Sequence, residues 1–314
     1  MKDIAEKWSD KQLLKLEREI RLIFKAAIVD TNKISKKLFE SFAKNDAKKR
    51  ELLKQGSITQ KDYDQWLKGQ LFQKKRYDTF IKQYTDMINK YDINAIDLIN
   101  NESLNIFAQN ANYIAYNTEI QAKIDDMFTL WDKNTVKKLV SEDSNILPTK
   151  ALNIKKNNAW NQKAIRRQLT QGIIQGESID KIAKRMQTVT DMNNTNALRN
   201  ARTAVTGAQN AGRQARMEES VELGLKPFKE WISTKDRRTR DTHVRLNGQT
   251  VEYDKPFKSD LGDIFFPGDI NAKPANVYNC RCTMKVVYKD LQKGTETKQS
   301  IDKKYKKFTN EMSI

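Results

Sequence analysis

An apolar pattern with a helical period runs through residues 9–55 and limits the possible folds more than any other feature of the chain. Its apolar side chains recur at three- and four-residue steps, as in an amphipathic helix. Ser9 is the expected N-cap, and Gly56 is the expected stop. A helix this long cannot bury its apolar stripe alone, so the pattern predicts a long partner helix. The stripe consists of Leu13, Leu16, Ile20, Ile23, Phe24, Ala27, Ile34, Leu38 and Phe42.

The partner helix is predicted to begin after Thr59 and to carry a stripe rich in aromatic side chains between Trp66 and Ile88. Aromatic residues interleaved with lysines can stack on single-stranded nucleic acid, but their helical spacing favours a helix-packing face. Residues 93–127 predict a third helix or helix pair, with irregularities caused by their many asparagines. Pro148 ends any helix that reaches it.

The next helices are predicted at residues 158–175, after Ser178, and at 196–223, with a polar loop at 190–196. Gly176 and Gly224 are the expected C-terminal caps. In the last helix, small side chains allow a neighbouring element to approach closely, and arginines could bind phosphate or form local ion pairs. The small residues are Ala201, Ala204, Ala208 and Ala211, and the arginines are Arg199, Arg202, Arg213 and Arg216.

After Gly224 the period changes from helical to extended. FKEWIST and RCTMKVVY predict strands, and Asn247-Gly248 predicts a tight type I′ turn. The expected fold is a mainly α N-terminal region of long antiparallel helices, followed by a small, loop-rich α+β domain. The predicted parts are a helical scaffold or docking arm (1–150), a helical linker bundle (151–225), the α+β domain (226–290), and a basic polar tail, mobile or weakly helical (291–314).

The composition is strongly basic, with 58 Lys and Arg against 40 Asp and Glu and a net charge of +18. This charge favours an acidic partner, with nucleic acid first and an anionic membrane second, although general lysine enrichment would produce it too. There is no apolar run of 18 residues, so no membrane span is expected. The N-terminus lacks an apolar signal core, so synthesis in the cytoplasm is expected.

The single histidine and both cysteines fall in the α+β domain. His243, Cys280 and Cys282 could together bind zinc, which prefers nitrogen and sulfur ligands, with Asp236 or Asp241 as the fourth ligand. The alternative has two small buried cysteines and a histidine bonded to a loop carbonyl. No cofactor is certain from the sequence, and zinc is the one it suggests.

A catalytic interpretation is open for the same region. His243 could act as a general base in a nuclease, with Arg238 and Arg240 holding phosphate. The sequence has no second histidine and no acidic pair with obvious metal spacing. A buried network in which Arg240 and Asp236 hold irregular loops is the simpler interpretation, so the chain is expected not to be an enzyme.

The order of motifs over residues 196–287 resembles the phage Mu F-like minor head protein family, also called phage head morphogenesis proteins. The motifs are ARTAVTGAQNAGR, KEWISTKDRRTRDTH, LNGQTV, PGD and NCRC. Ala204 stands where the family usually has an acidic residue. The resemblance marks as signature positions Trp231, Asp236, Arg238, Thr239, Arg240, His243, Gly248, Pro267, Gly268, Asn279, Cys280 and Cys282.

This resemblance implies a minor head (capsid) protein of a tailed phage or prophage that acts in head morphogenesis without catalysis. It implies portal protein and capsid or scaffolding proteins as partners, non-specific electrostatic contact with packaged DNA, and a location inside the virion head.

Overall fold

The computed structural model describes residues 2–71, 74–147, 154–175, 177 and 179–312. The chain divides into two compact units. Unit 1 contains residues 1–17, 98–150 and 198–314, and unit 2 contains residues 18–97 and 151–197. The predicted mainly α fold with a small α+β part is confirmed. The long helices are α1 (Ile4–Lys54), α2 (Gln60–Leu71), α3 (Lys74–Ala122), α5 (Ile154–Ile174) and α6 (Ile179–Glu222).

Unit 2 is built from helices that bury a shared apolar core. Trp66 stacks on Phe42 with ring centroids 5.7 Å apart, and Phe80 and Tyr84 are buried, so the aromatic stripe packs between helices. Thr59 and Asp62 cap α2 reciprocally, which explains its start. The core consists of Phe80, Ile81, Tyr84, Ile88, Ile165, Leu169, Ile173, Ile182, Met186 and Val189.

The first helix begins earlier than the sequence pattern predicted. Helix α1 begins at Ile4, and Asp3 accepts a hydrogen bond from the Glu6 amide at 2.8 Å as its cap. Ser9 is therefore not the N-cap; it is fully buried within the helix and accepts a hydrogen bond from Asn110. At the other end Gly56 has φ +72°, which confirms it as the stop.

Two predicted irregularities are wrong because buried asparagines find partners on neighbouring helices. Helix α3 runs unbroken through 93–122, and α6 runs through the expected loop at 190–196. In unit 2, Asn193 donates to Asn161, and Asn161 donates to Asn89, each at 3.0 Å. In unit 1, Asn110 of α3 donates to Ser9 of α1 at 2.9 Å. These bonds between helices offset the low helix propensity of asparagine. The predicted ends at Pro148, Gly176 and Ser178 lie outside the described residues.

Asp92 in unit 2 makes the stability of this unit dependent on pH. Burial raises the pKa of Asp92 to about 7, against hydrogen bonds from Asn161 and Asn157 that lower it. An acid with a raised pKa destabilises the fold as the pH rises from about 4 to 7, by about 1.4 kcal/mol per pH unit. Asp92→Asn is therefore expected to raise the melting temperature at pH 8 and to change it little at pH 4, as measured by calorimetry. An equal shift at both pH values would contradict this cause.

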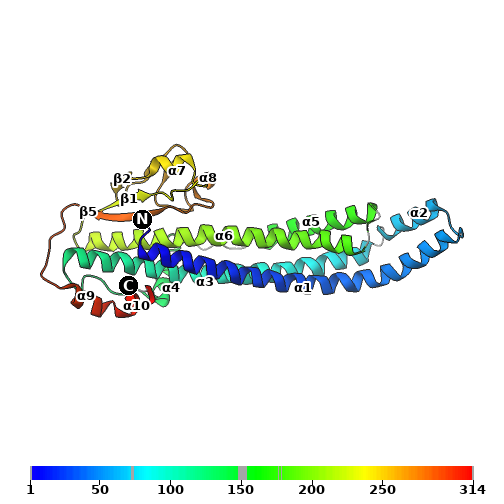
Figure 1. Cartoon of the computed structure of the whole chain (residues 1–314), viewed down its shortest axis with the longest axis horizontal. Helices are drawn as coiled ribbons and strands as arrows, with labels where there is room; N and C mark the ends of the chain where they lie inside the picture. The colour runs from blue at the N-terminus through cyan, green and yellow to red at the C-terminus, as the bar shows by residue number, and fades with distance from the viewer. Residues whose placement is uncertain (1, 72–73, 148–153, 176, 178, 313–314) are drawn as a thin grey trace. The chain divides into compact units, whose positions relative to one another are not determined.

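The small sheet of unit 1 is antiparallel, in the order β2-β1-β5. Phe228 of β1 pairs with Val287 of β5 and with Glu252 of β2. In Figure 1 these strands lie beside α7 and α8. A separate two-stranded ribbon, β3-β4, forms where the sequence predicted only loop. The elements are β1 (Pro227–Ile232), α7 (Asp241–Leu246), β2 (Thr250–Glu252), β3 (Phe257–Ser259), β4 (Gly262–Ile264), α8 (Pro274–Val277) and β5 (Thr283–Tyr288).

The Asn247-Gly248 turn is present, but its predicted type is wrong. Asn247 has φ −57° and ψ 122°, and Gly248 has φ +83°, which is a type II turn. The amide of Gln249 donates to Leu246 at 2.9 Å and closes the turn. A type I′ turn needs positive φ at both central residues, and Asn247 instead ends α7 with negative φ.

The C-terminal residues fold back within unit 1 as two short helices, α9 (Lys298–Lys304) and α10 (Lys306–Met312). Lys304 forms a 2.7 Å ion pair with Glu119 of α3, whose side chain is fully buried. Of the two predicted alternatives, mobile or weakly helical, the tail is helical, and its apolar side chains are buried. A further short helix, α4 (Lys133–Glu142), completes the unit. The buried side chains of the tail are Ile301, Tyr305, Phe308 and Met312.

Among the described helices, none has an apolar stretch that could cross a bilayer.

Candidate functional site

The loop after β1 is fastened to the segment that carries the two cysteines. The Arg281 guanidinium donates to both carboxylate oxygens of Asp236, and Thr234 donates its hydroxyl to the Arg281 carbonyl at 2.5 Å. This guanidinium holds the pKa of Asp236 well below its usual range. Asp236 also accepts a hydrogen bond from the Arg238 amide at 2.9 Å. Its carboxylate therefore joins two loops.

The other signature residues of this loop have structural contacts too. Thr239 donates its hydroxyl to the Thr234 carbonyl, and the guanidinium of Arg240 donates to the Tyr278 carbonyl. The Arg238 side chain is 81% exposed and lies 3.9 Å from Asp236. Thus the DxRTR motif mostly closes loops that lack regular backbone pairing.

Helix α6 binds the free edge of β5 and the cysteine segment with polar side chains on one face. Thr206 donates to the Cys280 carbonyl at 2.8 Å, and Arg213 donates to the Met284 carbonyl at 2.8 Å. Asn210 donates to the Cys282 carbonyl and accepts from the Met284 amide. These residues stand at positions i, i+4 and i+7 of the helix and substitute for a further strand.

Two glycines bring the PGD loop against α6. The left-handed backbone of Gly268, with φ +86°, approaches Gly207 so closely that a Cβ on Gly268 would lie 2.7 Å from the Gly207 nitrogen. Pro267 beside it is buried. Ala201, Ala208 and Ala211 of α6 are also buried, as expected for a close approach. The small residues of α6 therefore fix where the α+β part of unit 1 (residues 226–290), here called the motif unit, attaches.

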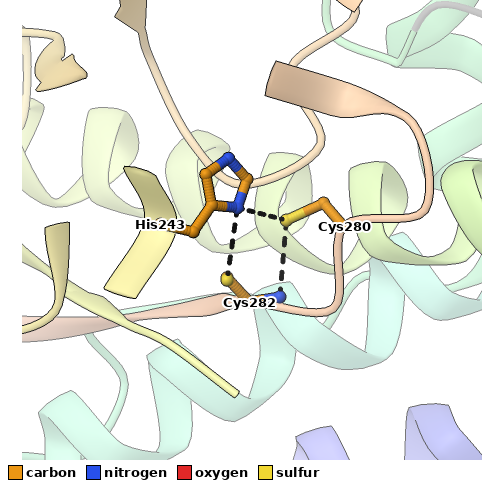
Figure 2. A group of neighbouring side chains, drawn as sticks. All are labelled: His243, Cys280 and Cys282. Atoms are coloured by element: carbon orange, nitrogen blue, oxygen red, sulfur yellow. Dashed lines mark hydrogen bonds between the residues drawn. The ribbon is translucent and has the colours of Figure 1, made fainter. Parts of the chain in front are cut away.

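His243, Cys280 and Cys282 converge in the core of this unit (Figure 2). His243 Nδ1 lies 3.5 Å from Cys280 Sγ and 3.6 Å from Cys282 Sγ, and all three residues are at most 3% exposed. The cysteines occupy the extended segment just before β5, and His243 comes from α7. Trp231 packs edge-on against the imidazole with ring centroids 5.2 Å apart. The left-handed Asn279, with φ +57°, turns the chain into this segment.

The two thiols are not equivalent. The hydrogen bond from Cys280 lowers the pKa of Cys282, and His243 and a backbone amide hydrogen bond from Thr234 add to this effect. The same contact, together with burial, raises the pKa of Cys280. A cluster of one imidazole and two thiols can bind a soft divalent cation, or it can form a hydrogen-bonded group.

Asp236 and Asp241, the expected fourth ligands, are not part of this cluster. Within the described residues, the group of possible metal-binding side chains contains only His243 and the two cysteines. Asp236 is held by Arg281, and Asp241 is exposed in the first turn of α7.

The geometry does not favour His243 as a general base toward a dissolved substrate. Its side chain is buried, and both ring nitrogens face protein atoms, with Nε2 3.2 Å from Asn276 Oδ1. Of the two arginines expected to hold phosphate, Arg240 donates to the Tyr278 carbonyl, and Arg238 is largely exposed to solvent. General base catalysis requires the base to reach the proton that it removes.

The four arginines predicted to bind nucleic acid differ in exposure. Arg213 and Arg216 are fully buried: Arg213 pairs with Asp3 at 2.7 Å, and Arg216 stacks 3.9 Å above the Trp131 ring. Arg202 forms an ion pair with Glu17 at 2.6 Å. Arg199 is exposed. Phosphate could not reach the two buried groups without repacking of the helix.

Sequence reasoning missed several residues that build this site. Asn276 contacts the imidazole, Arg281 pairs with Asp236, and Ser233 accepts from the Trp231 indole at 3.1 Å. Arg281 stands between the two cysteines in the sequence, and this position could have marked it as a residue of the site. Asn276 stands in α8, 33 residues from His243, and no local pattern links the two.

Comparisons with known proteins agree with the motifs. Residues 163–285 match the family described as Phage Mu protein F like protein, which confirms the resemblance over that range. The chain is 24% identical over 284 residues to the minor head protein GP7 of Bacillus phage SPP1, covering 89% of this chain and 84% of GP7. No solved structure matches.

A second relative is the NAD(+)–arginine ADP-ribosyltransferase EFV of Enterococcus faecalis. It is 33% identical over 132 residues, which cover 41% of this chain. The match spans only 27% of the length of EFV. The family match and the similarity to GP7 support a role in phage head morphogenesis.

Proposed function

We propose that this protein is a minor head protein of a tailed phage or prophage, and that it contacts portal or capsid proteins and packaged DNA without catalysing a reaction. The observation that carries this proposal is the match to GP7, which extends over 89% of the chain and therefore includes the long helices as well as the motif unit. The shorter match to EFV leaves most of that enzyme without a counterpart.

The structure supports a binding role through its surfaces rather than through a reactive centre. The signature residues mainly close loops and pack the motif unit on α6. The single histidine is buried, so the nuclease alternative would need it to become exposed. Exposed basic side chains line the solvent face of α1 and provide charge for contact with phosphates. They include Lys11, Lys15, Arg18 and Lys25.

Mass spectrometry of purified procapsids and virions tests the proposed location. The protein is expected in both particles, at far fewer copies than the major capsid protein, and it should co-purify with the portal protein. A matched phage preparation that lacks the gene provides the control. Absence of the protein from both particles would refute the proposal.

DNA binding is expected to be electrostatic, with an affinity that falls steeply with salt and differs little between sequences. The double variant Arg18→Glu, Lys25→Glu should bind more weakly and reduce the salt slope by about 0.9 for each phosphate that is no longer neutralised. The matched control is Lys255→Glu, Lys258→Glu, because these lysines already pair with Asp254 and Asp263. Fluorescence anisotropy with labelled duplexes measures both. An equal weakening in the two variants would exclude a specific role for α1.

Incubation with DNA, RNA and NAD⁺ tests the non-enzymatic part of the proposal. The protein and a His243→Ala variant are expected to give no cleaved nucleic acid and no ADP-ribosylated product. A product formed by the unmodified protein and absent from the variant would favour the enzyme alternative.

A further inference from the structure

We infer that His243, Cys280 and Cys282 bind a zinc ion that staples the motif unit. The side chains come from α7 and from the segment before β5, so one ion would join α7 to the segment that leads into β5. This inference goes beyond the proposed head role and does not depend on it.

The hydrogen bonds of Asn276 show which ring nitrogen of His243 donates to it. Asn276 Nδ2 lies 3.1 Å from the Gly262 carbonyl, which can only accept, so this atom is the amide donor. Asn276 Oδ1 is therefore the acceptor that faces His243 Nε2 at 3.2 Å, and it also accepts from Ser259. His243 must then carry its proton on Nε2.

In the neutral form of the ring, this tautomer directs the bare lone pair of Nδ1 toward two sulfur atoms. A lone pair can accept only one S–H hydrogen bond well, yet Nδ1 lies at nearly equal distances of 3.5 and 3.6 Å from the two sulfurs. Histidines that bind metals characteristically donate their other N–H to an oxygen acceptor, which fixes the tautomer and the ring orientation. Asn276 occupies this supporting position.

The spacing of the donor atoms fits one zinc ion. With Zn–N of about 2.0–2.1 Å and Zn–S of about 2.3 Å, tetrahedral angles place the nitrogen and sulfur atoms about 3.5–3.6 Å apart. The two Nδ1–Sγ distances of 3.5 and 3.6 Å agree with these values, and all three ligand atoms lie within 4.8 Å of one another. Figure 2 shows the three side chains facing one another. No rearrangement of the two nitrogen–sulfur pairs is needed.

The charges of the three side chains and a backbone hydrogen bond are also compatible with a bound zinc ion. Two thiolates and a neutral imidazole balance one divalent cation, so the buried group as a whole carries no net charge. The Cys282 amide donates to Cys280 Sγ at 3.4 Å, which stabilises a thiolate. Within the described residues, the group supplies three ligand atoms, one nitrogen and two sulfurs.

Metal content of the full-length protein, purified in buffer with zinc and then dialysed, tests the inference. We expect roughly one zinc ion per chain, and almost none in Cys280→Ser, Cys282→Ser or His243→Ala. The matched control is Leu246→Ala, which disturbs the same buried cluster without removing a ligand and should keep its zinc. Chelation should lower the melting temperature by several degrees in the unmodified protein and in Leu246→Ala, but not in the ligand variants.

Cobalt substitution gives a readout that does not depend on the stability of the variants. Cobalt in place of zinc should give thiolate-to-metal charge-transfer absorption and the ligand-field bands of a tetrahedral site. The conservative variant Asn276→Asp should keep the ion, because a carboxylate still accepts from Nε2, whereas Asn276→Leu should bind it 10- to 100-fold more weakly. A zinc-free protein whose thiols both react with a thiol reagent, or form a disulfide, would overturn the inference.

Discussion

Replacing Arg213 by methionine is expected to lower the free energy of unfolding by about 3–5 kcal/mol, because it breaks a buried ion pair and leaves its partners unsatisfied. Arg213 donates to both carboxylate oxygens of Asp3, at 2.7 and 2.9 Å, to Asn110 and to the Met284 carbonyl. Burial alone would raise the pKa of Asp3, but the guanidinium outweighs it and the pKa is lowered. One side chain thus joins the N-terminus, α3 and β5.

Urea denaturation followed by circular dichroism measures this decrease in stability. Arg199→Met on the same helix is the matched control, since Arg199 is exposed and its replacement should change stability by less than about 0.5 kcal/mol. The contribution of Asp3 is fully present above its ordinary pKa of 3.8 and is lost as the pH falls through its lower folded value. Equal stability of the two variants at pH 7 would show that the pair contributes nothing.

Gly212→Ala is expected to destabilise unit 1 by about 2–3 kcal/mol, because the added methyl group has no room. Its Cβ would lie 2.3 Å from the carbonyl oxygen of Phe107, and backbone cannot move aside as a flexible side chain can. Helices α3 and α6 would have to separate locally, which would also weaken the contacts that α6 makes with the sheet. Thermal unfolding followed by circular dichroism measures the effect.

Gly69→Ala is the matched control for this prediction. Gly69 also lies within a helix, α2, and a Cβ there meets nothing within 4 Å. Its replacement should stabilise the protein by about 0.5–1 kcal/mol, because alanine has the higher helix propensity. If Gly212→Ala were also stabilising, α3 and α6 could not lie as close together at Gly212 as described.

The helices were largely predictable from the sequence, but the predicted interruptions of α3 and α6 are absent from the structure. Apolar periodicity identifies α1 and the helical nature of residues 196–223 because burial of one face imposes that period. Asn193 indicates a loop when only its propensity is considered. In the folded chain it bonds to Asn161, and this tertiary partner overrides the local preference.

In the motif unit, too, features set by neighbouring residues were predictable, whereas contacts between distant residues were not. Strands β1 and β5 and the turn at Gly248 were predictable, whereas the β3-β4 ribbon was not. The turn type depends on the φ angle that α7 imposes on Asn247. The residues of the His–Cys cluster could be named from residue chemistry. The acceptor that fixes the tautomer of His243 could not, because Asn276 reaches it only through the fold.

The bond between Asp3 and Arg213 has a consequence for the timing of folding during synthesis. These residues are separated by 210 positions, and unit 1 combines the first, middle and last segments of the chain. A ribosome therefore releases the N-terminal segment long before its partner residues exist. Unit 1 can be completed only after β5, α9 and α10 have been synthesised, and its contacts of high sequence separation favour slow folding.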